Sequence, residues 1–195
     1  MHKRILIAAA AALVSCGGSS WIDPTTGNFS AQDSAAIVSM MSGAFGAVAR
    51  DPAQQVPLQN SKALTQSTTA SCAMGGSVTV TASAGGSCSA SGDYCDFNGS
   101  ASMSFTSCTT QDGYVGSNAP MTNGLEATFG GWQRTTGTTT SFDVKEHIWG
   151  GITVTRTDGT LVGTCGINVS VEVSSDGTTD TVHVNGTVCK QAVAQ

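Results

Sequence analysis

From Cys72 onward, apolar and polar residues alternate with a period of two through about seven segments. Successive side chains of a β-strand point to opposite faces of a sheet. Alternation of this kind therefore predicts antiparallel strands with one buried face and one wet face. The apolar members of the segments are Cys72, Met74, Val78, Val80 and Ala82; Ala101, Met103 and Phe105; Leu125, Ala127 and Phe129; Phe142, Val144 and Ile148; Ile152 and Val154; Ile167, Val169, Val171 and Val173; and Val182, Val184 and Val188.

Turn residues agree with this prediction. Asp158-Gly159 and Asp176-Gly177 stand between alternating segments and are strong signals for hairpin turns. The last three predicted strands should therefore form a meander. Only 11% of the residues are charged, and Ser, Thr and Gly supply most of the polarity. Such a composition suits strands, because β-branched Thr fits a pleated surface.

A single helix is predicted ahead of the strands, over residues 31–49. Ser30 and Asp33 resemble a capping box at its start, and apolar residues then recur at spacings of three and four. Asp51-Pro52 ends the helix, because a residue that precedes proline avoids the helical conformation. The polar residues 50–70 that follow are expected to form a linker. The apolar stripe of the helix consists of Ile37, Met41, Ala44, Phe45 and Val48.

The predicted fold class is therefore α+β, and mainly β. Residues 31–195 should form a single domain, in which a curved antiparallel sheet of about seven strands spans residues 72–189. The N-terminal helix is expected to pack on the apolar face of this sheet, since both elements have an apolar side to bury.

The first residues of the chain are typical of an export signal. Lys3 and Arg4 precede a short apolar run over residues 5–14. This run holds about ten residues, whereas a membrane-spanning helix needs roughly 20. The tetrad Leu13-Val14-Ser15-Cys16 ends the run and resembles the lipobox of bacterial lipoproteins. An ordinary signal peptide with an incidental cysteine is the alternative.

The resemblance implies that residues 1–15 are a lipoprotein signal peptide and that Cys16 is lipidated. Two or more acyl chains would anchor the protein stably in a membrane. Residues 16–30 would form a lipidated tether, because they are rich in Gly, Ser and turn residues and lack a periodic face. Gly17 is not the aspartate that retains enteric lipoproteins in the inner membrane, which favours the outer membrane of the cell envelope.

The chain holds seven cysteines, and six of them follow Cys16. An even number in an exported chain indicates disulfides, although sequence alone does not choose among the possible pairings. The second predicted hairpin brings Cys165 close to Cys189, so this pair is ranked first. The remaining pairs would be Cys88 with Cys95, which closes a small loop, and Cys72 with Cys108.

Charge limits the possible partners. Removal of the signal peptide leaves six of the eight Lys and Arg residues against 13 Asp and Glu residues. Without a basic stripe, neither nucleic acid nor a polybasic contact with anionic lipid is expected. The expected partners are the membrane, through the N-terminal lipid, and an envelope protein or a glycan.

No residue is assigned a catalytic or metal-binding role, and no cofactor is indicated. His147 and His183 are expected on polar strand faces, where a catalytic base would still need a nucleophile and an orienting acid. Asp93, Asp96 and Asn98 lack the spacing of a calcium loop. Three acidic residues are also expected on polar strand faces: Glu126, Glu146 and Glu172.

Trp132 and Trp149 leave two interpretations open. Both are out of phase with the apolar residues of their segments, and both lie beside glycine pairs, Gly130-Gly131 and Gly150-Gly151. The favoured interpretation is that bulges at the glycines reset the phase and bury both rings. The other is an exposed aromatic platform for sugars or for a partner.

The function expected from these features is non-catalytic: a cell-envelope lipoprotein with a binding, scaffold or surface role. One rival is a carrier of lipid or another hydrophobic ligand in a half-barrel cavity, which resembles periplasmic lipoprotein carriers in architecture alone. The other rival is a hydrolase of envelope polymers, although the chain has no G-x-S-x-G motif.

Overall fold

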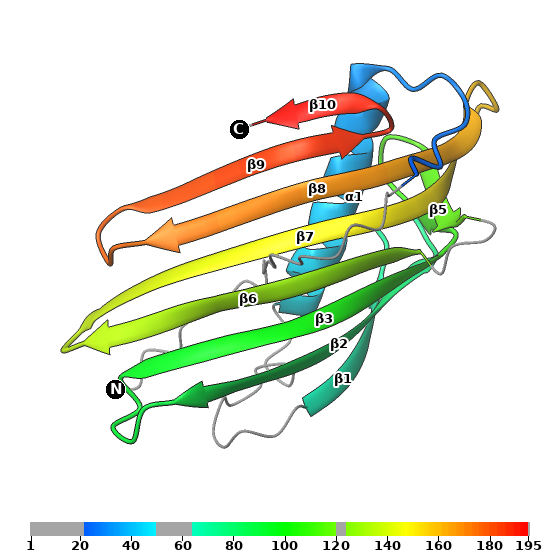
Figure 1. The fold of residues 1–195 in the computed structure, drawn as a ribbon. Helices are drawn as coiled ribbons and strands as arrows, with labels where there is room; N and C mark the ends of the chain where they lie inside the picture. The colour runs from blue at the N-terminus through cyan, green and yellow to red at the C-terminus, as the bar shows by residue number, and fades with distance from the viewer. Residues whose placement is uncertain (1–21, 50–63, 120–123, 195) are drawn as a thin grey trace.

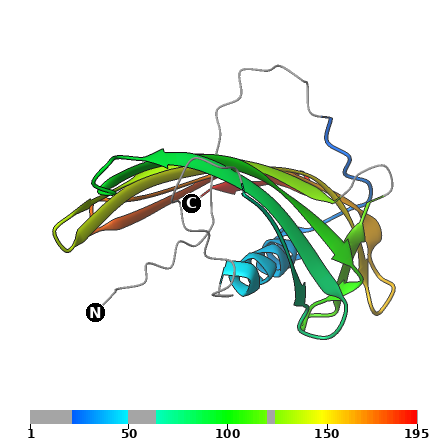
Figure 2. The same ribbon diagram turned by 90° about the horizontal axis from the view of Figure 1, so that it is seen from below.

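The computed structural model of the protein describes residues 22–49, 64–119 and 124–194. One helix and one large antiparallel sheet make up this part of the chain (Figure 1). The predicted class, α+β and mainly β, is confirmed. The sheet is arched, and the helix α1 (Ala31–Ala49) lies inside the arch (Figure 2). We call the inner side of the sheet the concave face and the outer side the convex face.

Within these described residues the sheet has ten strands, more than the sequence predicted. Two predicted segments, 142–148 and 152–155, are halves of one long strand, β7. The strands that the sequence did not predict are β1, β4, β5 and β10. The strand bounds are β1 (Leu64–Ser71), β2 (Ser77–Cys88), β3 (Tyr94–Thr106), β4 (Cys108–Thr109), β5 (Tyr114–Asn118), β6 (Leu125–Thr136), β7 (Thr139–Arg156), β8 (Val162–Ser175), β9 (Asp180–Val188) and β10 (Gln191–Ala194).

Neighbouring strands follow the order of the chain, with one interruption between β3 and β6. There the chain forms the short pair β4–β5, and β5 pairs with the second half of β7 while β6 pairs with its first half. Strands β5 and β6 therefore lie end to end beside β7. Both predicted hairpins are confirmed: Asp158-Gly159 lies between β7 and β8, and Asp176-Gly177 lies between β8 and β9.

The predicted linker at residues 50–70 is wrong in its second part, because Leu64–Ser71 form the edge strand β1. Residues 50–63 lie outside the described residues. Strand β1 escaped prediction because Ser, Thr and Gln populate both of its faces. Its hydroxyl groups nevertheless meet those of β2, with Ser67 3.0 Å from Thr81 and Thr69 2.9 Å from Thr79. Cross-strand pairs of this kind stabilise a sheet without any apolar burial.

The predicted start of the next strand at Cys72 is too early. Residues 72–76 form a turn in which Gly75 and Gly76 have positive φ, and β2 begins at Ser77. Met74 is consequently 66% exposed and does not join the apolar face.

Helix α1 packs against the concave face and completes the core. Ile37 is fully buried, and Met40 and Met41 are each 6% exposed. All the sheet residues in the following set belong to the predicted apolar faces. They are Val78, Val80, Met103, Phe105, Leu125, Ala127, Ile148, Ile152, Val154, Ile167, Val169 and Val188.

The start of α1 is tied to the sheet by one carboxylate. The Asp33 N–H donates to Ser30 Oγ (3.2 Å), and the Ser30 N–H donates to Asp33 Oδ2 (2.8 Å), which confirms the capping box. The second carboxylate oxygen, Oδ1, accepts a hydrogen bond from the hydroxyl of Tyr114 on β5 (2.7 Å). Asp33 thus caps the helix and fixes it to a strand at the same time.

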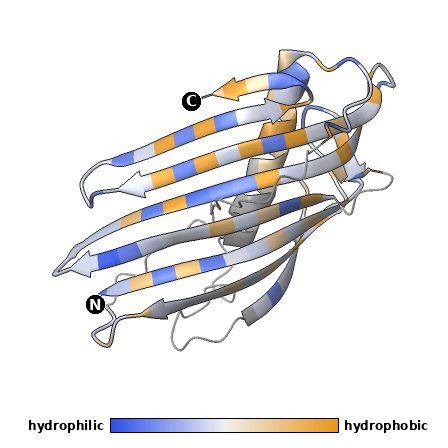
Figure 3. Ribbon diagram, viewed as in Figure 1, coloured by the Kyte–Doolittle hydropathy of each residue, from blue (hydrophilic) through white to orange (hydrophobic). Residues whose placement is uncertain are grey.

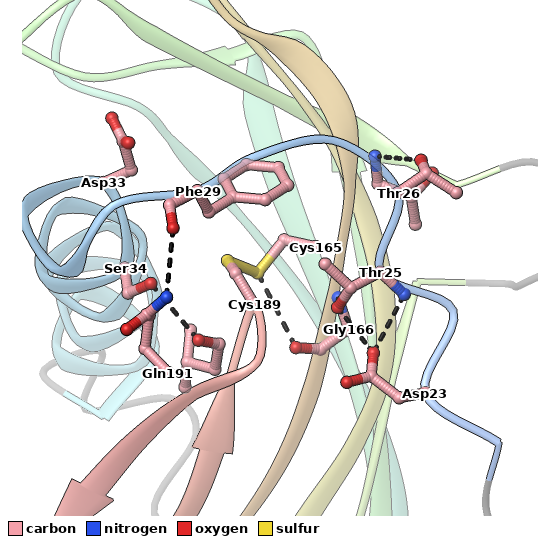
Figure 4. Close-up of a disulfide and its surroundings, with 12 residues drawn as sticks. Asp23, Thr25, Thr26, Phe29, Asp33, Ser34, Cys165, Gly166, Cys189 and Gln191 are labelled. Carbon is pink, nitrogen blue, oxygen red and sulfur yellow. Dashed lines mark hydrogen bonds between the residues drawn. A yellow bond between two sulfur atoms is a disulfide. The ribbon is translucent and has the colours of Figure 1, made fainter.

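Residues 23–29, which we call the strap, pack against the sheet (Figure 4). The prediction of a tether over residues 16–30 is therefore wrong for this part, while residues 16–21 lie outside the described residues. The Gly166 N–H donates to Thr25 Oγ1 (2.8 Å), and the Thr26 N–H donates to the carbonyl of Thr164 (2.9 Å). Because β9 pairs with β8 only from Ile167 onward, the strap binds the edge of β8 that β9 leaves open.

Glycines on β7 and β8 make room for the strap. A Cβ atom on Gly166 would overlap Asp23 Oδ1, and one on Gly163 would overlap the carbonyl oxygen of Thr26. A Cβ atom on Gly151 would lie 3.1 Å from Cγ of Pro24. In register, Gly151 and Gly166 belong to the convex face and Gly163 to the concave face. The strap therefore passes from the convex face over the edge of β8 to the concave face, where α1 begins.

The Cys165–Cys189 disulfide holds the hairpin on which the strap rests (Figure 4). Cys189 and Lys190 form the tight turn between β9 and β10, with positive φ values of 50° and 67° that non-glycine residues rarely adopt. Lys190 Nζ donates to the carbonyl of Thr25 (3.0 Å), and Gln191 Nε2 donates to the carbonyl of Phe29 (3.1 Å). The structure joins the same three pairs that the sequence ranking favoured: Cys165–Cys189, Cys88–Cys95 and Cys72–Cys108.

Substitution of Gly166 tests the seat of the strap. Gly166→Ala should displace Asp23 and Thr25, because the added methyl overlaps the Asp23 carboxylate, and should lower the free energy of unfolding by about 1–3 kcal/mol. Urea denaturation measures this loss, and hydrogen exchange at the Thr26 amide should accelerate. Ser170→Ala, on the exposed convex side of the same strand, is the matched control and should cost less than about 0.5 kcal/mol. Equal losses of the free energy of unfolding in the two variants would contradict the packing of the strap against Gly166.

Asp33 should make the stability depend on pH. Burial alone would raise the pKa of Asp33, but hydrogen bonds from Ser30 and Tyr114 outweigh it and lower the pKa below the ordinary value of 3.8. A pKa that is lower in the folded state contributes stability above about pH 4, and this contribution is lost as the pH falls through the folded-state pKa. Asp33→Asn should therefore flatten the decline of the free energy of unfolding below about pH 4.

Urea titrations between neutral pH and about pH 2 would measure this slope. Tyr114→Phe removes one hydrogen bond but leaves the capping box, so its slope should be intermediate. If the free energy of unfolding of Asp33→Asn declines as steeply at low pH as that of the wild type, this carboxylate does not control the loss of stability in acid.

Candidate functional site

Hydrophilic and hydrophobic residues alternate along the strands, so the convex face carries mostly polar residues (Figure 3). Ser and Thr from β1, β2 and β3 dominate one part of it, and the register places Asn168, Ser170, Glu172 and Ser174 of β8 on the same side. Convex positions on β3, β6 and β7 differ, because aromatic and charged side chains gather there. These positions form the candidate site.

One group, which we call the aromatic cluster, consists of Tyr94, Asp96, Trp132 and Arg134. Tyr94 and Asp96 begin β3, and the register sets them opposite Arg134 and Trp132 of β6. The rings of Tyr94 and Trp132 are stacked, with centroids 6.3 Å apart and an angle of 21° between their planes. The Arg134 guanidinium carbon lies 5.4 Å from the centre of the Tyr94 ring. The Tyr94 hydroxyl donates to Asp96 Oδ1 (2.7 Å), which also raises the pKa of Tyr94.

A second aromatic pair lies farther along β7. The ring centroids of His147 and Trp149 are 5.1 Å apart, and the two ring planes are tilted by 34°. His147 Nε2 lies 2.7 Å from Oδ1 of Asn168 on β8, a hydrogen bond in which the imidazole nitrogen is the donor. This bond orients the imidazole along the convex face, beside the indole.

The register decides between the two interpretations of the tryptophans. Trp132 lies opposite Asp96 and Asp143, and Trp149 lies opposite Glu126 and Asn168. Pairing continues without a shift through both glycine pairs, so the prediction that bulges reset the phase is wrong. Both indoles lie on the convex face. Neighbouring side chains leave each ring half-buried, so a platform would use only the part of each indole that stays open to solvent.

Charged side chains of both signs separate the two aromatic groups. Lys145 Nζ lies 2.7 Å from Glu172 Oε1 and 3.8 Å from Asp143 Oδ2. The hydrogen bond with Glu172 and the charge of Asp143 raise the pKa of Lys145, so it stays cationic. Because these ion pairs are exposed, they contribute little to stability. They do alternate positive and negative charge across this face.

The other predicted site residues fall into three groups. Cys16 lies outside the described residues. His183, Glu126 and Glu172 lie on the convex face as expected, and Asp93 accepts hydrogen bonds from the Ser89 and Ser91 hydroxyls, which lower its pKa. Within the described ranges, no group of three or more His, Cys, Asp or Glu residues is placed to hold a metal ion.

The prediction for Glu146 is wrong. Glu146 has the phase of Val144 and Ile148 on β7, so it belongs to the concave face, and it is only 6% exposed. The sequence analysis treated it as an ordinary acid of a polar face. Its position two residues from each of two buried aliphatic residues could have corrected that assignment.

A pocket of about 380 Å³ lies on the concave side. Ala36 and Met40 of α1 form one wall, and residues at the ends of β1, β2 and β4 form the other. Its volume is within the range of small-molecule sites.

The sequence analysis missed Tyr94 and Arg134. Neither belongs to an apolar alternation, so neither attracted attention on its own. Their signal was the phase that Tyr94 shares with Asp96 and that Trp132 shares with Arg134, but the pairing of β3 with β6 was needed to bring the two together.

Comparisons with known proteins give no relative for this arrangement. No protein-family model matches the chain, and neither the curated proteins nor the solved structures include a significant match. In the part of the chain that the structure describes, no helix combines the length and apolar character required to cross a membrane.

Proposed function

We propose that the protein is a lipid-anchored component of the cell envelope that binds a partner, without catalysis, through its convex face. The observation that carries this proposal is the aromatic cluster. Tyr, Trp and Arg are the residues that contribute most to binding at protein surfaces. Here these residue types lie together on the convex face, whereas the apolar residues of the sheet are buried on the concave face.

A non-catalytic role fits the surroundings of the histidines. His147 donates its Nε2 proton to an amide oxygen, which is neither a nucleophile nor an orienting acid. His183 lies opposite Glu172, on an exposed stretch of β9. A hydrolase would need a nucleophile, a base and an acid that converge on one point. A binding role therefore suits these side chains better than envelope-polymer hydrolysis.

The strap favours one orientation of a lipid-anchored domain. If Cys16 carries lipid, the residues between Cys16 and Ile22 span at most about 20 Å when extended. The strap begins on the convex face, at Gly151 and Gly166. Asp143 lies opposite Trp132, and the segment of β7 from Asp143 to Gly151 spans about 25 Å. The aromatic cluster would then stand at the end of the sheet away from the anchor, accessible to a partner.

Lipidation at Cys16 has a direct test. Cys16→Ala should release the protein from the membrane fraction and abolish incorporation of radiolabelled palmitate, because the acyl chains provide the anchoring. The other six cysteines are paired, so Cys165→Ala with Cys189→Ala is a control that should leave labelling unchanged. Separation of inner and outer membranes would show the location. Unchanged labelling of Cys16→Ala would refute the lipoprotein assignment.

A carrier of lipid or another hydrophobic ligand is the second candidate, and the pocket beside α1 favours it. Native mass spectrometry of protein from a bacterial envelope should then detect a retained lipid. Ala36→Leu should abolish the retained mass, because Ala36 lines the pocket, while Val162→Ala, at a position that is 66% exposed, should not. A chain that never retains lipid would leave the convex face as the functional surface.

A further inference from the structure

We propose that the aromatic cluster binds a neutral, hydroxyl-rich glycan chain. This inference rests on the proposed function and names the class of partner for the same surface. It follows from the chemistry of four side chains, from the charges around them and from the shape of the sheet at that point.

The stacked rings offer a surface that matches a sugar. A pyranose ring has C–H groups on its faces and hydroxyl groups around its rim. The indole of Trp132 is bordered by Tyr94, and each ring keeps part of its area open on the half-buried convex face. Packing of C–H groups against an aromatic ring removes apolar area from water on both partners. The rigid rings also lose little conformational entropy on binding.

Polar groups at the edge of the rings match the hydroxyl rim. Asp96 and Arg134 are exposed on either side of the rings, one an acceptor and the other a donor with several N–H groups. The hydrogen bond from Tyr94 to Asp96 and the contact of Arg134 with the Tyr94 ring hold both groups in place before a ligand arrives. Preorganised donors and acceptors of this kind favour neighbouring hydroxyls.

The charge pattern argues for a neutral ligand. The cluster holds one cation, Arg134, and one anion, Asp96, and Lys145 forms ion pairs with two carboxylates, Asp143 and Glu172. The whole chain has a formal net charge of −5, so anionic polymers are repelled at long range. The cluster therefore offers phosphorylated or sulfated polymers no excess of positive charge.

The shape of the surface argues for a chain and not for a small molecule. Small ligands bind in concave pockets that enclose most of their surface. The cluster lies on the outer side of an arched sheet, where a ligand is covered from one side only (Figure 2). An extended ligand can compensate, because several contacts along one chain raise the overall affinity.

Carbohydrate pull-down tests the proposal with chitin, amylose and cross-linked dextran as neutral probes and heparin beads as the anionic probe. The folded wild-type chain should bind at least one neutral probe and not heparin. Trp132→Ala should weaken this binding about tenfold, which corresponds to about 1.4 kcal/mol. Arg134→Ala should also weaken it. Met74→Ala, which shortens a 66% exposed side chain far from the cluster, should bind like the wild type.

Trp132→Phe guards against a folding defect. This variant keeps an aromatic ring and should retain most of the binding, and each variant is first checked by urea denaturation. Failure to bind any neutral probe, binding to heparin alone, or equal binding by Trp132→Ala and the wild type would overturn the glycan assignment. Membrane fractionation of Cys16→Ala is independent of these results, so failure of the glycan proposal can be told apart from failure of the anchor.

Discussion

Burial of the concave face by α1 is the interaction on which the rest of the structure depends. A single sheet with one apolar face must cover that face with a second layer. Here the second layer is one helix, and Ile37 in its second turn is fully buried. Asp33 fixes the start of the helix to Tyr114, and the Ser34 hydroxyl donates to the carbonyl of Val188 (3.2 Å). The core is therefore closed from the concave side, and the convex face contacts the strap only near Gly151 and Gly166 in the part of the chain that the structure describes.

The strap fixes the N-terminal segment to the sheet on which α1 packs. It passes from the convex face over the edge of β8 to the first residue of α1. The N-terminal segment and the helix are therefore both attached to the sheet at this edge. The residues that hold the strap are far from it in the sequence. They are the glycines of β7 and β8, and Lys190 in the turn between β9 and β10. If Cys16 carries lipid, its acyl chains would lie within about 20 Å of chain from the start of the strap.

The sequence predicted the helix and the long strands, in which a buried face imposes a period, and missed β1, which has no apolar period, and the short strands β4, β5 and β10. Alternation identified the core positions of the sheet, and the three- and four-residue spacing identified α1, because burial imposes both periods. Strand β1 and the strap have no such period: hydroxyl pairs hold the first, and backbone hydrogen bonds to β8 hold the second. The prediction for Glu146 was wrong for a different reason. It assumed that an acidic residue lies on the polar face of its strand, whereas this carboxylate has the phase of the buried residues.

The candidate site was only half predictable for a related reason. Trp132 and Trp149 stood out because a large aromatic ring in a polar phase is costly to leave against water. Tyr94 and Arg134 became part of the site only through the pairing of β3 with β6, which no local pattern encodes. A binding surface on a sheet is a set of cross-strand neighbours, so its composition depends on register. The stack of Tyr94 on Trp132 depends on this register, because a shift of one strand by one residue would place the two rings on opposite faces of the sheet.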